Sequence, residues 1–305
     1  MSALRQAAKD YLALRRRMGY GLVQDGKRLL EYVEFLQRGR HARVTTENAL
    51  AWARDAVSRH SAAHRLSVVR GFAEFRRLAD ARTEVPSKDL LPDRARRRPP
   101  YIYSDDDVQA LLRAAKTLCG PLHPWTYSTL FGLLAATGMR VGEASALDRS
   151  DVDFDEGVVR VRNGKQGSAR RLPLHASTAA ALGAYGRRRD RLIPNPRSSS
   201  FFLSEAGTSL LRQNVHATFL RLVERAGLAD RRPRRPRIHD LRHSFAVQTV
   251  SDWYRAGRDV EQLLPRLSAY LGHVSPVSTY WYLTGTPTLM SRAVQRLERA
   301  MGRST

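Results

Sequence analysis

One break in the sequence, from Glu84 to Pro100, does most to limit how this chain can fold. The segment EVPSKDLLPDRARRRPP contains four prolines and a run of arginines, and no apolar periodicity continues through it. Because proline lacks the backbone N–H that a continuing helix needs, regular structure has to stop here. We therefore expect two domains, residues 1–84 and 101–305, joined by a basic, proline-rich linker at 85–100.

The part before the break is predicted to be a small helical bundle. Apolar residues recur at helical spacing in four segments, which begin near Leu4, Leu29, Thr46 and His64. Amphipathic helices bury their apolar faces against one another, and four helices of this length form a bundle. The last segment turns Arg65 and Arg70 outward, where they either contact phosphate or face solvent.

The part after the break combines helices with a small antiparallel sheet. Ser104 followed by three aspartates predicts a helix N-terminus, because a serine cap and acidic side chains stabilise the first helical turn. Alternating and β-branched residues predict three short strands, at 152–154, 157–161 and 170–174. Further helices are expected at 124–137, 177–186 and 209–227. The expected fold class is thus mainly α with a small antiparallel β-sheet, an N-terminal helical bundle plus an α+β domain.

The net charge limits which class of partner the chain can bind. The chain has 52 Lys and Arg against 29 Asp and Glu, a net charge of +23, which points to nucleic acid as the polyanionic partner. The sequence shows no run of eighteen apolar residues, no lipidation motif and no apolar core of an export signal, so we expect no membrane partner. The single cysteine, Cys119, excludes an internal disulfide framework and fits a reducing cytoplasm, where we expect it to be buried.

Side chains that can carry chemistry gather between His239 and Tyr282. In HDLRH, His239, Arg242 and His243 are three and four residues apart, so they lie near one face of a helix. An LGH turn then presents His273, and Tyr282 follows it by nine residues. A phenol, imidazoles and a guanidinium together can attack and stabilise a phosphodiester without a metal.

Two metal sites are alternative interpretations of these and nearby residues. The spacing of His239 and His243 also fits a zinc helix, but Arg242 between them would repel a dication. An aspartate series starting at Asp151 resembles a calcium loop, yet the position of the loop's last carboxylate ligand is Arg162. We therefore expect neither a metal ion nor another cofactor.

The order and spacing of the motifs resemble the signature of the tyrosine recombinases, the phage integrase family. The resemblance rests on Arg140 in TGMRVGEASAL, on HDLRH, on LGH and on the tyrosine that follows, and it covers the chain from about Tyr101 onward. It implies a catalytic second domain, and the helical first domain is similar in plan to the family's core-binding domain. By this likeness the phosphate is held by Arg140, His239, Arg242 and His273, and the nucleophile is Tyr282.

The resemblance also implies a role for Lys165, in the turn NGKQGS between the second and third expected strands. In the family, a lysine of this hairpin protonates the leaving 5′ oxygen. The chain has five lysines against 47 arginines, and Lys165 is the only lysine after Lys116. Because arginine does not release its proton, a lysine here fits general acid catalysis, with a solvated turn lysine as the alternative.

Two further segments adjoin the motifs. The stretch RRPRRPR places five arginines just before His239, and its prolines exclude a helix, so we expect phosphate contacts rather than a solvated charge run. The predicted phosphate-contacting residues are Arg65, Arg70, Arg234, Arg235 and Arg237. Apolar residues at helical spacing between Thr288 and Met301 predict a terminal helix, which in the family commonly docks onto a neighbouring protomer.

The resemblance implies a site-specific recombinase that cleaves and rejoins DNA through a 3′-phosphotyrosyl intermediate, in integration, excision, resolution or transposition. The implied partners are double-stranded DNA, other copies of the chain in a synaptic tetramer, and related recombinases or accessory proteins. The expected location is the bacterial cytoplasm, at the nucleoid. Two alternatives remain open: a type IB topoisomerase, which reseals the same strand, and a DNA-binding accessory protein without catalysis.

Overall fold

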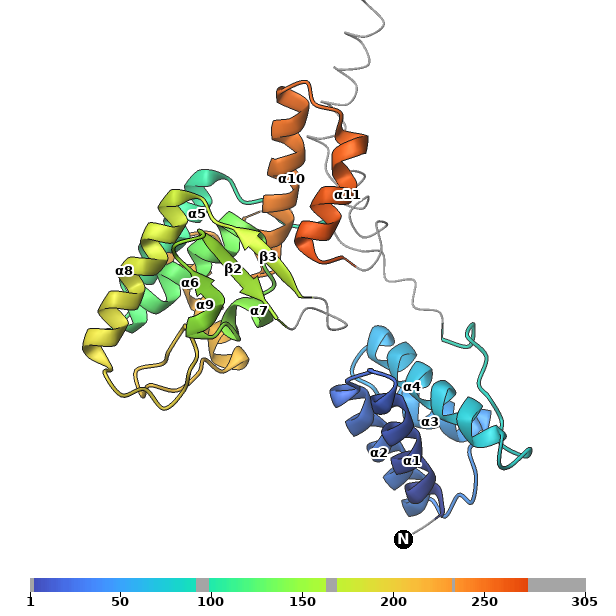
Figure 1. The fold of residues 1–305 in the computed structure, drawn as a ribbon. Helices are drawn as coiled ribbons and strands as arrows, with labels where there is room; N and C mark the ends of the chain where they lie inside the picture. Colours follow the sequence, from blue (N-terminus) through green and yellow to red (C-terminus); the bar gives the residue numbers. More distant parts are fainter. Residues whose placement is uncertain (1–2, 92–98, 163–168, 232–233, 274–305) are drawn as a thin grey trace, which may run out of the picture. The chain divides into compact units, whose positions relative to one another are not determined.

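The computed structural model describes residues 3–91, 99–162, 169–231 and 234–273 (Figure 1). Contacts within the chain divide it into two compact units, Met1–Arg97 and Arg98–Thr305. The described residues are mostly helical, with a three-stranded antiparallel sheet in the second unit. The fold class predicted from the sequence is therefore confirmed.

The first unit is a bundle of four helices around one apolar core. Its helices are α1 (Ala3–Arg17), α2 (Val23–Arg38), α3 (Thr46–Arg54) and α4 (Arg59–Arg77). Each turns one apolar stripe inward, as in α2, where Leu29, Val33 and Leu36 are fully buried. The Tyr32 hydroxyl donates a hydrogen bond to Asn48 Oδ1 (2.6 Å), which ties α2 to α3 inside the core.

The segment after α4 stays attached to the first unit. Val85 and Leu91 pack against the core of the bundle. Arg70 on α4 donates hydrogen bonds to the backbone carbonyls of Pro86 (2.8 Å) and Ser87 (2.9 Å). The beginning of the expected linker is thus held by apolar contacts and hydrogen bonds, which its sequence did not predict because single apolar residues between prolines carry no periodicity.

The second unit contains seven described helices and a small sheet. The helices are α5 (Asp105–Lys116), α6 (His123–Thr137), α7 (Val141–Ser145), α8 (Ala176–Leu192), α9 (Arg212–Arg225), α10 (Asp240–Arg255) and α11 (Val260–Leu271). A 3₁₀ turn at Arg149–Asp151 leads into β1 (Val152–Asp153), β2 (Val158–Val161) and β3 (Arg170–Pro173). α6 is apolar on several sides because α5, α8 and α10 all pack against it.

The predicted helices and strands of this unit that fall on described residues are present, with some changes. α8 continues past its predicted end at Gly186 to Leu192, since one glycine costs a helix only about 1 kcal/mol. α11 was not predicted, because Pro265 within it interrupts the pattern of a continuous helix. The expectation that Cys119 is buried is wrong, because this residue lies exposed in the loop between α5 and α6.

The strand register determines which side chains of the sheet face the core. β2 lies between β1 and β3 and is antiparallel to both. Val159 pairs with Leu172 and Val161 pairs with Arg170. Val159, Val161 and Leu172 are buried, and because successive side chains of a strand alternate between faces, Arg170 points inward and Arg171 outward.

α10 and α11 lie side by side and share a small apolar core of their own (Figure 1). Buried members of this core include Val250 on α10 and Leu264 and Leu267 on α11.

Among the described helices, none combines the length and the apolar composition that crossing a lipid bilayer requires.

Candidate active site

The candidate site forms at the C-terminal end of α11. Gly272 adopts a φ of 67° and ends the helix. The Gly272 N–H donates to the Ala269 carbonyl (2.9 Å), and the His273 N–H donates to the Ser268 carbonyl (3.0 Å). These are the two hydrogen bonds of a Schellman cap, which favours glycine at its left-handed position. The LGH sequence therefore determines where the backbone of His273 lies relative to the helix end.

Three consecutive carbonyls at this helix end each accept a hydrogen bond from a different arginine. Arg170 Nε donates to Tyr270 O (2.9 Å), Arg242 Nη2 to Leu271 O (2.6 Å) and Arg140 Nη2 to Gly272 O (2.8 Å). The last carbonyls of a helix accept no hydrogen bond from within the helix, and they lie at the negative end of the helix dipole. Cations are therefore stabilised there. The three arginines come from β3, from α10 and from the residue that precedes α7.

Arg242 is the most deeply buried of the three, with 2% of its surface exposed. Its Nη1 also donates to the carbonyl of Gly138 (2.8 Å), the residue that ends α6 with a φ of 61°. Because a buried charge is costly unless it is hydrogen-bonded, these carbonyl contacts are what allow the guanidinium to remain inside the fold. Arg242 thus joins the end of α6 to the end of α11.

Glu143 on α7 links the other two arginines. Arg140 donates to Glu143 from its backbone N–H (3.0 Å) and from Nη1 (2.7 Å), and Arg170 donates from Nη1 (3.2 Å) and Nη2 (2.7 Å). Burial acts to raise the pKa of Glu143, but the hydrogen bonds from Arg170 and Arg140 outweigh it and hold the pKa below its ordinary value. One carboxylate charge therefore lies between two guanidiniums.

Two imidazoles adjoin this cluster. Burial, together with the charges of Arg242 and Arg140, lowers the pKa of His273 to about 4. Burial and the charge of Arg242 also lower the pKa of His239. Both rings are therefore neutral at pH 7, so each can accept a proton on one nitrogen and donate a hydrogen bond from the other.

A cavity of about 440 Å³ opens beside His239. Its lining includes three arginines, Arg140, Arg162 and Arg212, and three carboxylates, Glu143, Asp148 and Asp151. The arginines attract an anion such as a phosphodiester, and the carboxylates reduce the net positive charge that it would meet. Among the described residues, no group of three or more histidines, cysteines or acidic side chains is arranged to hold a metal ion.

His243 lies one helical turn after His239, and the two rings are 4.8 Å apart in an edge-to-face arrangement. Burial, together with the neighbouring His239, lowers the pKa of His243 to about 3. His243 therefore packs against the ring of His239 and supports it.

A buried carboxylate, Asp240, organises the basic segment that precedes α10. Arg237 donates to it from the backbone N–H (2.9 Å) and from Nη2 (2.8 Å), and Arg234 Nη2 lies 3.9 Å from it. Arg235 donates instead to Glu224 Oε1 (2.8 Å) on α9. The side chains of Arg237 and Arg235 are about half exposed, so they keep donors that can reach a phosphate.

Two arginines of the first unit also have contacts within the chain. Arg65 Nη1 donates to the Trp52 carbonyl (3.1 Å), and its guanidinium lies 4.9 Å from the centre of the Trp52 ring. Arg70 holds the segment after α4, as described above. These contacts occupy part of the five donors of each guanidinium.

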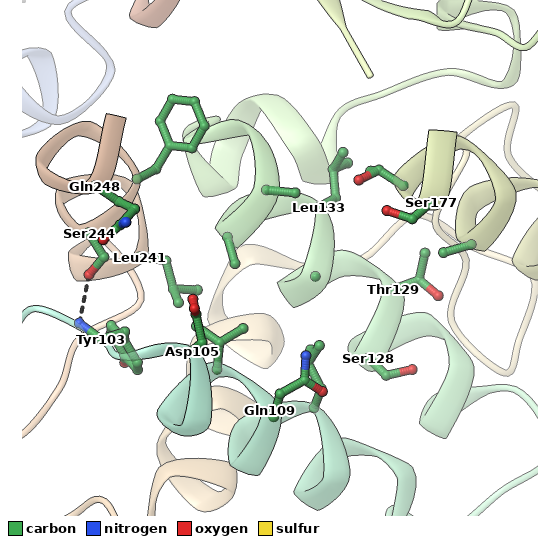
Figure 2. A pocket seen from close by; sticks show the side chains of 18 of the residues that line it. Tyr103, Asp105, Gln109, Ser128, Thr129, Leu133, Ser177, Leu241, Ser244 and Gln248 are labelled. Atoms are coloured by element: carbon green, nitrogen blue, oxygen red, sulfur yellow. Dashed lines mark hydrogen bonds between the residues drawn. The ribbon is translucent and has the colours of Figure 1, made fainter. Parts of the chain in front are cut away.

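A larger groove, of about 920 Å³, lies between α5, α6, α8 and α10 (Figure 2). Leu133 and Leu241 contribute apolar surface to it, and Gln109 and Gln248 contribute polar groups. No described member of the predicted catalytic set lines this groove. It is therefore a different surface from the arginine and histidine cluster.

Comparison with known proteins identifies the family to which this cluster belongs. The profile of the phage integrase family matches residues 102–287, which is more than half of the chain and includes every predicted catalytic residue. The chain belongs to the phage integrase family. Members of this family, the tyrosine recombinases, cleave and rejoin DNA strands, and the chain is an enzyme of that class. Site-specific recombination is favoured over the topoisomerase and accessory-protein alternatives.

Individual relatives agree with the family assignment. The putative integrase/recombinase y4rB of Sinorhizobium fredii (strain NBRC 101917 / NGR234) is 45% identical, with 98% of each chain covered. Tyrosine recombinase XerD of Bifidobacterium longum (strain NCC 2705) is 31% identical over 75% of this chain and 73% of its own. The solved structure of XerH site-specific recombinase bound to palindromic difH substrate gives a TM-score of 0.65 at 19% identity, covering 90% of this chain and 78% of that one. The Tn1549 transposon integrase with a circular intermediate DNA gives 0.64 at 17% identity, covering 95% and 99%.

The structure brings together four residues of the set that the tyrosine recombinase signature predicts: Arg140, His239, Arg242 and His273. Lys165 and Tyr282 lie outside the described residues, as do Tyr280 and the expected terminal helix. The roles of all six stay predictions that contacts alone do not test.

Two members of the cluster, Glu143 and Arg170, were not predicted from the sequence. Glu143 could have been found, because a glutamate three residues after Arg140 at a helix start is placed to bind the backbone N–H of the residue before the helix. Arg170 gave no such signal, since it is one of two adjacent arginines and only the strand register turns it inward.

Proposed function

We propose that Tyr282 attacks a DNA phosphodiester held by the described cluster of Arg140, Arg242, His239 and His273. Attack at phosphorus forms a bond from the phenol oxygen, breaks the bond to the 5′ oxygen, and leaves a 3′-phosphotyrosyl link and a free 5′ hydroxyl. Because this link replaces one phosphodiester by another, a 5′ hydroxyl of the same or a different strand can reverse the reaction without ATP or a metal ion.

The observation that carries the proposal is that Arg140 and Arg242 donate hydrogen bonds to neighbouring carbonyls at the end of α11. The pentavalent transition state gains negative charge on its non-bridging oxygens. Guanidiniums that are already fixed stabilise this charge without reorganising during the reaction. The turn that follows these carbonyls presents His273, so one helix end positions both arginines and one imidazole.

Proton transfer requires two further groups. Tyrosine has an ordinary pKa near 10, so Tyr282 has to lose its proton as it attacks. A neutral imidazole, from His239 or His273, can accept that proton or hydrogen-bond to a phosphate oxygen. Lys165, between β2 and β3 in the sequence, then protonates the leaving 5′ oxygen, which an arginine could not do.

The remaining positive charge binds the DNA backbone. We propose that residues 1–84 form the core-binding domain, that the basic segment at 85–100 leads to the catalytic domain at 101–305, and that all three contact phosphates. The net charge of +23 supports this arrangement. The arginines proposed to contribute are Arg65, Arg70, Arg234, Arg235 and Arg237, each of which keeps donors beyond its internal contacts.

Exchange of strands between two sites requires four active sites, so we propose that the chain acts as a tetramer on DNA, with or without related recombinases and accessory proteins. A lambda integrase whose fold is similar was solved as a dimer bound to a core site. The apolar pattern of 288–301 is the segment proposed to contact a neighbouring protomer. The proposed location is the bacterial cytoplasm, at the nucleoid, in a reaction of integration, excision, resolution or transposition.

Genome-wide trapping of the covalent intermediate tests the proposal. The chain would be expressed in a host, the cells lysed in denaturant, and DNA that carries the protein enriched and sequenced. We expect adducts at a few sites that share a sequence, and their loss in Tyr282→Phe. Adducts scattered without sequence preference would indicate a topoisomerase, and DNA binding without any adduct would indicate an accessory protein.

A further inference from the structure

Arg170, the first residue of β3, reaches two other elements with one guanidinium. Its Nε donates to the carbonyl of Tyr270 (2.9 Å) at the end of α11. Its Nη1 and Nη2 donate to the two carboxylate oxygens of Glu143 on α7, at 3.2 and 2.7 Å. The side chain is only 10% exposed. All three nitrogens are thus engaged, and a planar, bidentate pair of this kind fixes orientation as well as distance.

These contacts close into a ring through Arg140. Glu143 Oε1 also accepts from Arg140 Nη1 (2.7 Å), and Arg140 Nη2 donates to the carbonyl of Gly272 (2.8 Å). Gly272 lies two residues after Tyr270, the carbonyl that Arg170 holds. The ring therefore joins β3, the start of α7 and the end of α11, which are distant in the sequence. Moving any one member breaks a charge-assisted hydrogen bond in a largely buried place.

Arg170 also packs directly on the turn before His273. A Cβ atom on Gly272 would lie 2.8 Å from Arg170 Nη1 and 3.1 Å from its Cζ. Glycine is therefore required at position 272 for two reasons, the φ of 67° and the close approach of the guanidinium. The same side chain thus touches both the carboxylate that orients Arg140 and the turn that presents His273.

We propose that Arg170 is a positioning residue for DNA cleavage, which locks the β2–β3 hairpin onto the phosphate-binding cluster. It acts through Glu143 on Arg140 and through the end of α11 on His273. Because β3 begins five residues after Lys165 in the sequence, the same anchor sets the strand that follows Lys165 against the cluster. The inference rests on the proposed function and adds to it a residue that need not touch DNA.

The chemistry of the contact requires arginine. A lysine ammonium cannot donate to one carbonyl and to both oxygens of a carboxylate in a single plane. Misplacing a catalytic group by about 1 Å can cost roughly 10²-fold in rate. We therefore expect Arg170→Lys, which keeps the charge, to lower the rate of cleavage about as strongly as Arg170→Ala.

β3 supplies a matched control. Arg171 follows Arg170 on the same strand but faces the opposite side, where its side chain is 59% exposed and lies 3.5 Å from Glu156. Arg171→Ala therefore removes the same charge from the same strand without touching the ring.

The first measurement is single-turnover formation of the covalent adduct on a nicked half-site taken from the trapping experiment. We expect the rate to fall about 10²-fold in Arg170→Lys and Arg170→Ala, with the dissociation constant for the uncut half-site changed less than about 3-fold. Arg171→Ala should keep the wild-type rate. Added methylguanidinium should recover part of the cleavage activity of Arg170→Ala and none of that of Tyr282→Phe. If Arg170→Ala lost activity only because the fold is destabilised, methylguanidinium would not restore it.

The second measurement needs no DNA. Hydrogen exchange at the amides of Gly272 and His273, which close the helix cap, should become faster in Arg170→Lys and stay unchanged in Arg171→Ala. The two measurements test the proposed function and the role of Arg170 separately. A wild-type chain that forms no adduct contradicts the proposed function. Unchanged exchange at these amides in Arg170→Lys contradicts the coupling of Arg170 to the end of α11.

Wild-type cleavage by a folded Arg170→Lys or Arg170→Ala variant would overturn the proposal. An equal loss in Arg171→Ala, or a loss of DNA binding as large as the loss of cleavage, would also do so. If Arg170→Ala does not fold, the cleavage rate of Arg170→Lys alone tests the proposal. If neither folds, Arg170 acts in stability and the positioning role is rejected.

Discussion

Arg140 and Glu143 are joined by two hydrogen bonds, from the arginine's backbone N–H (3.0 Å) and from its guanidinium (2.7 Å). One carboxylate therefore orients both the backbone and the side chain of a proposed phosphate-binding residue. Glu143→Gln keeps the size but removes the charge and one of the two acceptor oxygens. We expect adduct formation to slow by about 10- to 100-fold while DNA affinity stays equal or rises slightly, because the variant gains one net positive charge.

Glu156 provides the control for this prediction. Its carboxylate is 67% exposed and pairs only loosely with Arg171, so Glu156→Gln removes the same charge far from the cluster. Single-turnover cleavage and fluorescence anisotropy of both variants would be compared. Equal cleavage rates in Glu143→Gln and Glu156→Gln would contradict the orienting role of Glu143.

Acid should destabilise the second unit, Arg98–Thr305, through its buried histidines. Burial lowers the pKa of His243 to about 3 and that of His273 to about 4, whereas an unfolded histidine titrates near 6.5. Between these values the unfolded chain binds more protons than the folded one, so the free energy of unfolding falls as the pH drops below 6.5. The loss from His243 alone between pH 7 and pH 5 is on the order of 2 kcal/mol.

Urea unfolding at several pH values measures this effect. His243→Phe cannot titrate, so its free energy of unfolding should depend less steeply on pH between 7 and 5 than that of the wild type. The variant's absolute stability is not the criterion, because packing changes as well. An identical slope in both proteins would show that His243 does not remain neutral in the folded state.

The sequence was sufficient for most of the elements because their signals are local. Ser104 caps α5 with a capping box, and Gly138 ends α6 in the left-handed conformation. Each of these depends on residues within one turn of the chain. Family resemblance then brought Arg140 and Arg242 into one site, where the structure places them on neighbouring carbonyls.

The rest depends on contacts between distant segments. Whether Arg170 or Arg171 faces the core is decided by the pairing of β2 with β3, and shifting the register by one residue would exchange them. Arg70 similarly appeared as an outward cation, but the path of the chain after α4 places two carbonyls within its reach. Composition and periodicity contain no information on such partners.

DNA binding should depend steeply on salt. With a net charge of +23, the chain is expected to neutralise many phosphates and release their counterions. For six to ten phosphate contacts, affinity falls by roughly 10³- to 10⁵-fold between 50 and 200 mM salt. Anisotropy titrations of Tyr282→Phe, which cannot cleave, measure binding alone, and a flat response would contradict extensive backbone contact.

Lys165→Ala should separate binding from chemistry. The variant keeps the cluster that holds the phosphate, so DNA affinity should change little, while cleavage of an ordinary strand should fall by about 10²- to 10⁴-fold for loss of a general acid. A substrate with a 5′ thiol leaving group needs little protonation, so the variant should cut it at close to the wild-type rate. Equal impairment on both substrates would show that Lys165 acts in some other way than by donating a proton.

Tyr282, rather than Tyr280, should carry the DNA adduct. The nine-residue step from His273 selects Tyr282 by the family signature, and two residues apart on a helix would direct the phenols about 200° apart, so only one can face the cluster. Tyr282→Phe removes a single oxygen and should abolish the adduct while leaving DNA binding and the unfolding transition nearly unchanged. Tyr280→Phe is the matched control and should still form the adduct. Peptide mapping of the trapped complex decides between them, and DNA linked to Tyr280, or an adduct that persists in Tyr282→Phe, would overturn the assignment.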